Sequence, residues 1–172
     1  MKRLPVIVIV ITALGTPCFA QTPTPGPEVQ KLGYFLGVWE AEGELIGGPS
    51  AGKFSGQSPC EWFPGGFHVV CRRDGTSPEG KHTDLMVFGY DAEAKSYTLY
   101  TITSRGIALF AKGSLTGNTW TWQWEEKTEG RPTTYRITQV GLSPTSYTIK
   151  VDCSVADGPW TVIEQGKATK VK

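Results

Sequence analysis

Apolar and polar side chains alternate through most of this chain, with the period of two that is typical of half-buried β-strands. In residues 38–45 (VWEAEGEL), glutamates face one way and apolar or small residues face the other. Residues 119–126 (TWTWQWEE) place three tryptophans on one face, and residues 146–153 (SYTIKVDC) gather their apolar side chains on one face. With the two arms around Pro64, and similar segments at residues 52–57, 83–90, 96–103, 107–115, 133–140 and 159–170, the pattern predicts about ten strands.

Short turn-forming segments separate these strands at regular intervals. They are GGPSAG, RDGTSPEG, YDAEAKS, SRG, LTGN, TEGRP, LSPTS and VADGP. Because each connection is short, neighbouring strands should pair antiparallel, and a single up-and-down β-barrel closes them without an exposed sheet edge. A two-sheet sandwich is the alternative. Residues 28–36 follow Pro27 with apolar side chains near helical spacing, which predicts a short N-terminal helix.

The first residues, MKRLPVIVIVITALGTPCFA, have the layout of a secretory signal peptide: a basic pair, an apolar stretch too short to span a bilayer, and a small residue at Ala20. We expect residues 1–20 to be removed, residues 21–27 to form a Pro-rich lead-in and residues 28–172 to form one barrel domain, periplasmic or secreted. Removing Lys2 and Arg3 leaves 15 Lys and Arg against 16 Asp and Glu, a formal charge of −1. This balance predicts no nucleic-acid partner, and the leader predicts no stable membrane anchor.

The segment CEWFPGGFHVVC carries two of the three cysteines that follow residue 20. A hairpin with a two-residue or four-residue loop centred on Gly65-Gly66 places Cys60 directly opposite Cys71, within reach of a disulfide. In an oxidising compartment we therefore expect a disulfide that staples the hairpin. A redox dithiol normally lies at the start of a helix, and a zinc site needs two further ligands, so both alternatives fit less well. Cys153 lies on the apolar face of its strand, where we expect a small buried residue.

Aromatic side chains are concentrated on the faces that should point into the barrel. They are Trp39, Trp62, Trp120, Trp122, Trp124 and Tyr147. In a small barrel such side chains either fill the interior or line a ligand pocket, and the sequence leaves both possibilities open. Because Trp120, Trp122 and Trp124 alternate along one strand, they suggest a flat wall for a small apolar or aromatic ligand.

The sequence contains no nucleophile elbow, zinc-protease motif, Walker loop or dinucleotide fingerprint. The polar face of the hairpin carries Glu61 and His68, which form a surface cluster or, if this face points inward, orient a ligand beside the aromatic wall. Three function classes follow: a barrel that binds a small apolar or aromatic molecule, an enzyme (isomerase or hydrolase) acting through Glu61 and His68, and a filled barrel that binds a protein partner on its outer face. We expect no metal site, and the oligomeric state is not set by these patterns.

The ordered set LGVWEAEGE, CEWFPGGFHVVC, FGYDAEAKSYTLY, SRG, GNTWTW and SVADGPWTVIEQGKATK resembles bacterial members of the domain of unknown function 1579 family. The entry to the first strand at Gly37-Val38-Trp39 also resembles the start of calycin barrels such as lipocalins. The resemblance implies a lipocalin-like or nitrobindin-like antiparallel barrel without an established activity. In lipocalins a basic side chain from the last strand covers the first-strand tryptophan, which implies a structural role for Trp39 with Lys167 or Lys170. Nitrobindins bind haem through a histidine late in the chain; since His82 is the last histidine here, we expect no haem and no other cofactor.

Overall fold

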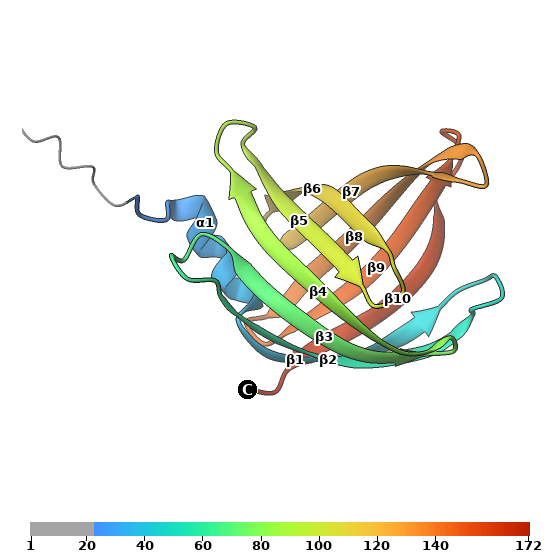
Figure 1. Cartoon of the computed structure of the whole chain (residues 1–172), viewed down its shortest axis with the longest axis horizontal. Coiled ribbons are helices and arrows are strands. Elements are labelled where there is room, and N and C mark those ends of the chain that lie inside the picture. The colour runs from blue at the N-terminus through green and yellow to red at the C-terminus, as the bar shows by residue number, and fades with distance from the viewer. Residues whose placement is uncertain (1–22) are drawn as a thin grey trace, which may run out of the picture.

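A computed structural model describes residues 23–172, which form ten antiparallel strands after a short helical segment (Figure 1). The helical segment consists of α1 (Pro27–Lys31) and the 3₁₀ helix η1 (Leu32–Phe35). The strands are β1 (Gly37–Leu45), β2 (Gly52–Trp62), β3 (Val69–Ser77), β4 (Gly80–Asp91), β5 (Ser96–Thr103), β6 (Ala108–Thr116), β7 (Thr119–Thr128), β8 (Arg131–Ser143), β9 (Ser146–Val155) and β10 (Thr161–Lys170). The expected signal peptide, residues 1–20, lies outside the described residues.

The sheet is closed because β1 pairs with β10 as well as with β2. Every other strand pairs antiparallel with its two neighbours in the sequence, which is the up-and-down order. The fold class predicted from the alternating pattern, a single antiparallel barrel of about ten strands with a short N-terminal helix, is therefore confirmed. The sandwich alternative is excluded, since a sandwich would leave β1 and β10 as unpaired edges.

The predicted turns lie between the strands with one correction. The segment RDGTSPEG, expected to be a turn, is mostly strand: only Pro78 and Glu79 form the connection between β3 and β4. Asp74 pairs with Thr83 across these strands, and its carboxylate accepts a hydrogen bond of 2.6 Å from the Thr83 hydroxyl. Cross-strand bonding thus overrides the turn propensity of Asp-Gly, and it places Arg73 within a strand.

The N-terminal helical segment lies across one end of the barrel (Figure 1). Pro27 begins α1 as predicted, but the single helix expected for residues 28–36 changes to a 3₁₀ turn at Leu32. The η1 turn buries Leu32 and Phe35, and the Phe35 ring stacks on Phe88 with 4.6 Å between ring centroids. This segment therefore acts as an apolar plug at its end of the barrel.

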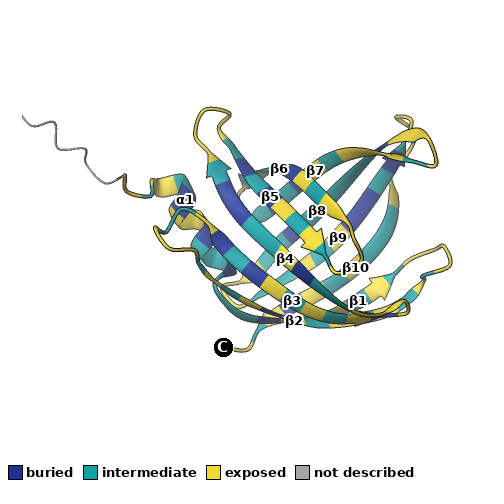
Figure 2. Ribbon diagram, in the orientation of Figure 1, coloured by how far each residue is buried: buried dark blue, intermediate teal, exposed yellow. Residues whose placement is uncertain are grey.

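Burial alternates along strands such as β1, β2 and β6 (Figure 2). In β1, Trp39 is buried, whereas Glu40, Glu42 and Glu44 are exposed on the outer face. The buried apolar cluster joins η1 to β3, β4, β5, β6 and β7; its members are Leu32, Phe35, Val69, Cys71, Phe88, Tyr97, Leu99, Ala111, Trp120 and Trp122. The packed core thus lies inside the barrel at the end that the plug covers. No helix within residues 23–172 has the length and apolar character needed to cross a membrane.

The hairpin between β2 and β3 carries the expected disulfide, Cys60–Cys71. The two cysteines are cross-strand partners, and the Phe63 amide donates a hydrogen bond of 2.8 Å to the His68 carbonyl. The loop therefore has four residues, one of the two lengths that keep the cysteines in register. Both sulfur-bearing side chains point into the barrel, where Cys71 is buried.

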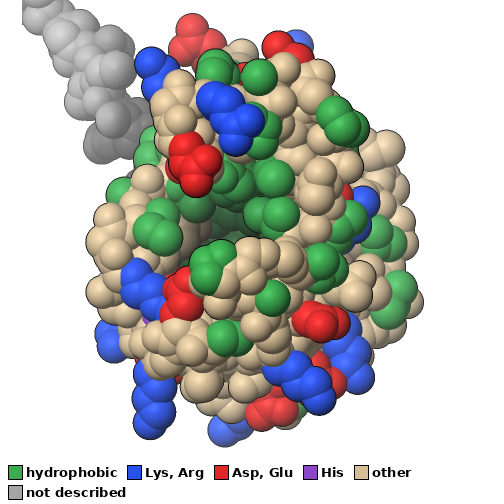
Figure 3. Space-filling view, turned by 90° about the vertical axis from the view of Figure 1, so that its right-hand side faces the viewer, with side chains coloured by type: hydrophobic (Ala, Val, Ile, Leu, Met, Phe, Trp, Pro, Cys, Tyr) green, Lys and Arg blue, Asp and Glu red, His purple; other side chains and the backbone are tan. Residues whose placement is uncertain are grey.

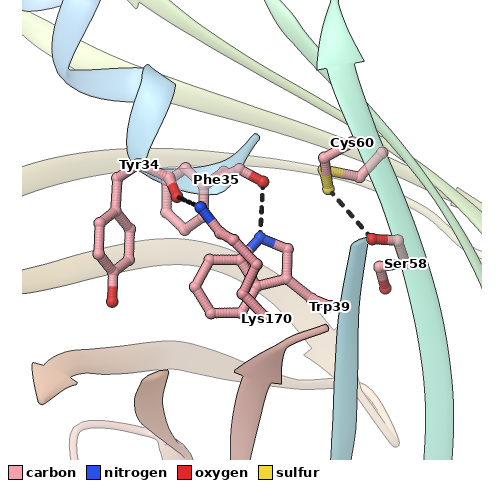
Figure 4. Close-up of a disulfide and its surroundings, with 7 residues drawn as sticks. Tyr34, Phe35, Trp39, Ser58, Cys60 and Lys170 are labelled. Atoms are coloured by element: carbon pink, nitrogen blue, oxygen red, sulfur yellow. Dashed lines mark hydrogen bonds between the residues drawn. A yellow bond between two sulfur atoms is a disulfide. The ribbon is translucent and has the colours of Figure 1, made fainter. Parts of the chain in front are cut away.

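Trp39 and Lys170 close the seam between the first and last strands (Figure 4). The two residues are cross-strand partners, and the Lys170 ammonium lies 4.8 Å from the centre of the Trp39 ring. The indole N–H of Trp39 donates a hydrogen bond of 2.7 Å to the Phe35 carbonyl, and Lys170 donates one of 3.4 Å to the Tyr34 carbonyl. Of the two lysines considered from the sequence, Lys170 covers the tryptophan. Lys167 instead pairs with Glu42 on the outer face at 3.0 Å.

We expect the double substitution Cys60→Ala/Cys71→Ala to lower the free energy of unfolding by about 3 kcal/mol, because the broken loop gains chain entropy in the unfolded state. Urea unfolding of the oxidised wild type and the double variant measures the difference. Cys153→Ala, which removes the free cysteine of the described region, is the matched control and should change the stability less. Equal stabilities of the wild type and the double variant would contradict a stabilising staple.

The substitution Lys170→Met should cost about 1–2 kcal/mol, since it removes a cation from the Trp39 ring and a charged hydrogen-bond donor from the Tyr34 carbonyl. Lys167→Met should change the stability by less than about 0.5 kcal/mol, because the exposed Lys167–Glu42 pair contributes little. Thermal and urea unfolding of the two variants, side by side, tests this difference. If the two substitutions had the same effect, the seam role assigned to Lys170 would be wrong.

Candidate functional site

A cavity of about 320 Å³ remains inside the barrel beyond the packed core. Its wall is mainly apolar and aromatic, and the most prominent side chains in it are Trp39, Phe54, Phe88, Trp122, Trp124 and Tyr147. The end of the barrel opposite the helical plug is hollowed, and hydrophobic side chains line the hollow (Figure 3). The interior is thus filled at one end and open at the other.

Two of the three tryptophans of the predicted wall line the cavity. Trp122 is fully buried, and its indole N–H donates a hydrogen bond of 2.9 Å to the Gln139 side chain. Trp124 is half-buried and stacks on Tyr135 with 5.0 Å between ring centroids. The indole nitrogen of Trp124 is buried without a hydrogen-bond partner within residues 23–172. Trp124 therefore offers a flat aromatic surface nearer to the solvent than Trp122 does.

Trp120 and Trp62 lie at the plugged end and do not line the cavity. Trp120 is buried between the Phe35 ring, at 5.0 Å, and the Tyr97 ring, at 4.8 Å. Trp62 is half-buried below the helical segment, close to Gly33. Trp62 and Trp120 face inward, as predicted. Because they lie at the plugged end of the barrel, they pack against neighbouring side chains and do not line the cavity.

Tyr147 lines the cavity on the β9 side, where its ring lies 4.9 Å from the Trp39 ring. Burial raises the pKa of Tyr147 to about 12, although Arg73 and a hydrogen bond with Gln139 act in the opposite direction. Its hydroxyl stays protonated at neutral pH, so Tyr147 is a neutral hydrogen-bonding group in the cavity wall.

Glu61 and His68 lie on the outer face of the hairpin and are exposed, which corrects the idea that they orient a ligand inside the barrel. The physical reason is alternation: Cys60 and Trp62 point inward, so Glu61 between them must point outward. His68 lies over the backbone of Gly89 on the outside. The enzyme hypothesis that used this pair has no support from its placement.

A cluster of charged side chains faces the interior toward the open end, where β3 ends and β4 begins. The Arg73 guanidinium donates from Nε to Oδ2 of Asp84 at 2.7 Å and from a terminal nitrogen to the same oxygen. The His82 Nε2 lies 3.7 Å from that oxygen. Asp84 is only 1% exposed, and its second oxygen, Oδ1, has no hydrogen-bond partner within the described chain.

Glu164 joins this cluster from the inward face of β10, which it shares with Gly166 and Ala168, and a neighbouring β-bulge also turns Ile163 toward the cavity. The pairing of β10 with β9 shifts between Val162 and Glu164, so Ile163 and Glu164 both line the cavity. Burial raises the pKa of the Glu164 carboxyl, the Arg73 charge lowers it, and the Asp84 charge raises it further. Within residues 23–172, no group of three or more His, Cys, Asp or Glu side chains is arranged to hold a metal ion.

Arg73, His82, Asp84 and Glu164 were not among the residues selected from the sequence. The signal for Arg73 and Asp84 is the inward face of their strands, which Cys71 and Phe88 define. The turn expected at RDGTSPEG concealed this signal for Arg73, whereas Asp84 lies in a segment that was predicted as a strand. Glu164 shares a face with Gly166 and Ala168, yet a carboxylate on an inward face is unusual in a barrel. Alternation alone could therefore have identified these positions, although not their contacts.

Fold and cavity together define a closed antiparallel β-barrel with a partly open, aromatic-lined interior. The chain belongs to the family described as "Protein of unknown function (DUF1579)", whose model matches residues 24–169. This match confirms the resemblance drawn from the ordered motifs.

Two solved structures resemble the barrel. The crystal structure of Rv2717c from M. tuberculosis matches with a TM-score of 0.60 and 13% identity, covering 86% of this chain and 99% of that chain. At this identity the likeness shows the fold alone. A de novo designed fluorescence-activating β-barrel has a TM-score of 0.45 and 15% identity, covering 81% of this chain and 95% of that chain, which is too distant to bear on function. No curated protein matches this chain.

We expect Glu164→Gln to raise the thermal unfolding midpoint at neutral pH. Because the pKa of Glu164 is raised above 4.5 in the folded state, the folded protein holds this proton more tightly than the unfolded chain does. The contribution of Glu164 to the free energy of unfolding therefore falls as pH rises through the folded pKa. Melting curves of the wild type and the variant should differ most at neutral pH and converge below about pH 4. Glu42→Gln on the outer face is the control, and a less stable Glu164→Gln at neutral pH would contradict this assignment.

Proposed function

We propose that this protein binds a small, mainly apolar or aromatic molecule in the barrel cavity. The observation that carries the proposal is an aromatic-lined cavity of about 320 Å³ behind an open barrel end. Natural pockets for small molecules usually have volumes of roughly 300–1,000 Å³. The cavity is at the lower limit of that range, which suits a compact ligand of one or two rings.

The uneven filling of the barrel supports a ligand rather than a purely structural interior. Protein interiors are normally close-packed, with few voids larger than a water molecule. At the plugged end this rule holds, since Phe35, Trp120 and Tyr97 pack ring against ring. At the other end the side chains leave a continuous space, and each apolar group that enters it gains roughly 25 cal/mol per Å² of buried surface.

Within the cavity, Trp122, Trp124 and Tyr147 supply the binding surface of this proposal. Trp122 has its indole N–H satisfied by Gln139 and contributes an apolar ring. Trp124 presents a ring that Tyr135 holds in place by stacking, so little rotamer freedom is lost on binding. Trp62, Trp120, Glu61 and His68, which lie elsewhere, are not part of the proposed site.

An extracytoplasmic location is part of the same proposal. The Cys60–Cys71 disulfide supports it, because structural disulfides form and persist mainly in oxidising compartments. The signal peptide expected at residues 1–20 would provide the export route. A ligand-binding barrel in the periplasm or the medium would meet its ligand outside the cytoplasm.

Trp124→Ala should weaken binding of the neutral probe naphthylethanol at least about tenfold, because the variant loses the flat surface against which an aromatic ring stacks. Isothermal titration calorimetry with the purified, oxidised protein measures the affinity. Trp160→Ala is the matched control: Trp160 is exposed on the outer face, where the Arg136 guanidinium lies over its ring at 4.0 Å.

The control should bind the probe like the wild type. Trp122 is unsuitable for this test because it is fully buried, and truncating a buried tryptophan typically costs about 3–5 kcal/mol of stability. A wild-type protein that does not bind the probe, or a Trp124→Ala variant with unchanged affinity, would overturn the proposed site.

A further inference from the structure

Charged groups line the open end of the cavity. Arg73, Asp84 and Glu164 line a recess of about 190 Å³ near the mouth. Arg73 and Glu164 also line the main cavity, so the recess and the cavity are adjoining parts of one interior space. A molecule in the cavity would therefore place one end against these groups.

Arg73 and Asp84 already satisfy each other in part. Two guanidinium nitrogens of Arg73 donate to a single oxygen of Asp84, so one cation is matched to one carboxylate. The other oxygen, Oδ1, is left without a hydrogen-bond donor from the described chain, although Asp84 is only 1% exposed to solvent. An unpartnered buried acceptor costs free energy, which a donor group from a ligand would recover.

Glu164 is the second acceptor without a donor. Its environment consists of burial and the nearby charges of Arg73 and Asp84, with no hydrogen bond to its carboxylate from residues 23–172. Arg105 and His82 also line the recess, and the Arg105 guanidinium is already paired with Glu79 at 2.9 Å. With Glu164 ionised and His82 neutral, Arg73, Asp84 and Glu164 therefore leave a net charge of −1 beside the neutral Arg105–Glu79 pair. A single positive charge would neutralise the recess.

We propose that the ligand of this cavity is an amphipathic amine, whose ammonium group binds Glu164 beside the Arg73–Asp84 pair while its apolar body lies along the Trp124 side of the cavity. This inference rests on the proposed function, since it specifies the chemistry of a ligand in the same cavity. The ammonium supplies donors to Glu164 and to the acceptor side of Asp84, and it brings the charge of the recess to zero.

Ligands with other head groups match the recess less well. A carboxylate could approach Arg73, but it would then face the charges of both Asp84 and Glu164. A hydroxyl could donate one hydrogen bond, but it would leave the net negative charge uncompensated in a partly desolvated site. The amine alone supplies both donors and the opposite charge.

The position of Glu164 also sets the orientation of the ligand. Because Glu164 lines both the recess and the main cavity, an ammonium bound there leaves the remainder of the molecule inside the apolar part. The polar head then lies toward the mouth, where it keeps partial contact with water, and the ring system lies deeper, beside Trp124. This orientation minimises the desolvation cost, because the charged head group stays near water and the ring system lies against apolar side chains.

The test compares three probes that share a naphthyl ring and differ in the head group: naphthylethylamine, naphthylethanol and naphthylacetate. Calorimetric titration at pH 7.5 should show the amine binding at least about tenfold more tightly than the alcohol, and the acid binding most weakly. Glu164→Gln keeps the shape of the side chain and removes its charge. It should reduce the preference for the amine over the alcohol to less than about threefold.

Glu42→Gln, which removes an exposed carboxylate from the outer face, is the control variant and should keep the full preference. If the alcohol or the acid bound as tightly as the amine, or if Glu164→Gln kept the amine preference, the amine inference would be overturned while the proposed binding cavity stood. If none of the three probes bound to the wild type, the proposed function and the inference would both be overturned.

Discussion

The pairing of β1 with β10 is the contact on which the rest of this molecule depends. Once the sheet is closed, every second side chain of ten strands must point into one enclosed space. Eight strands already give an interior that side chains can just fill or that holds one small ligand, so ten strands enclose more space than their own side chains need. The Trp39–Lys170 contact secures this closure at the seam.

Because the barrel is closed, the way its interior is packed decides where space for a ligand remains. The chain fills one end of the barrel with η1 and a set of stacked rings, so the excess space is confined to the other end. Because the plug and the Cys60–Cys71 staple hold the filled end together, the hollow end does not have to supply the stability of the fold. A void in a protein core is normally a loss of contacts, and in this barrel that loss is confined to the end away from the plug.

The charged groups of the interior also lie at the hollow end, away from the packed core. Burying Arg73, Asp84 and Glu164 inside the barrel costs free energy that only partners can offset. Arg73 and Asp84 offset part of it by pairing with each other. Within the described chain Glu164 has no such partner, and burial raises the pKa of its carboxyl. An incomplete set of partners at the mouth of an apolar cavity is an arrangement that a ligand can complete.

The period of two in the sequence determined the strands, the antiparallel closure and the inward face of most residues. It also determined that Cys60 faces Cys71, since only the loop length had to be known, and by the same rule it should have turned Glu61 and His68 outward. It could not decide between Lys167 and Lys170 for the Trp39 ring, because that choice needs the register of β1 against β10, which are far apart in the chain.

Only the tertiary structure decided which inward residues form a site. Alternation gives the face of a side chain but not its height along the barrel, which depends on the tilt and stagger of all ten strands. For that reason Trp120 packs below the plug while Trp124, on the same face of the same strand, lines the cavity. Arg73 and Glu164 come together for a similar reason: a turn shorter than its composition suggests extends β3, and the pairing of β10 with β1 brings Glu164 to the same end of the barrel. Such contacts depend on long-range strand pairing, whereas the strands themselves are specified by neighbouring residues.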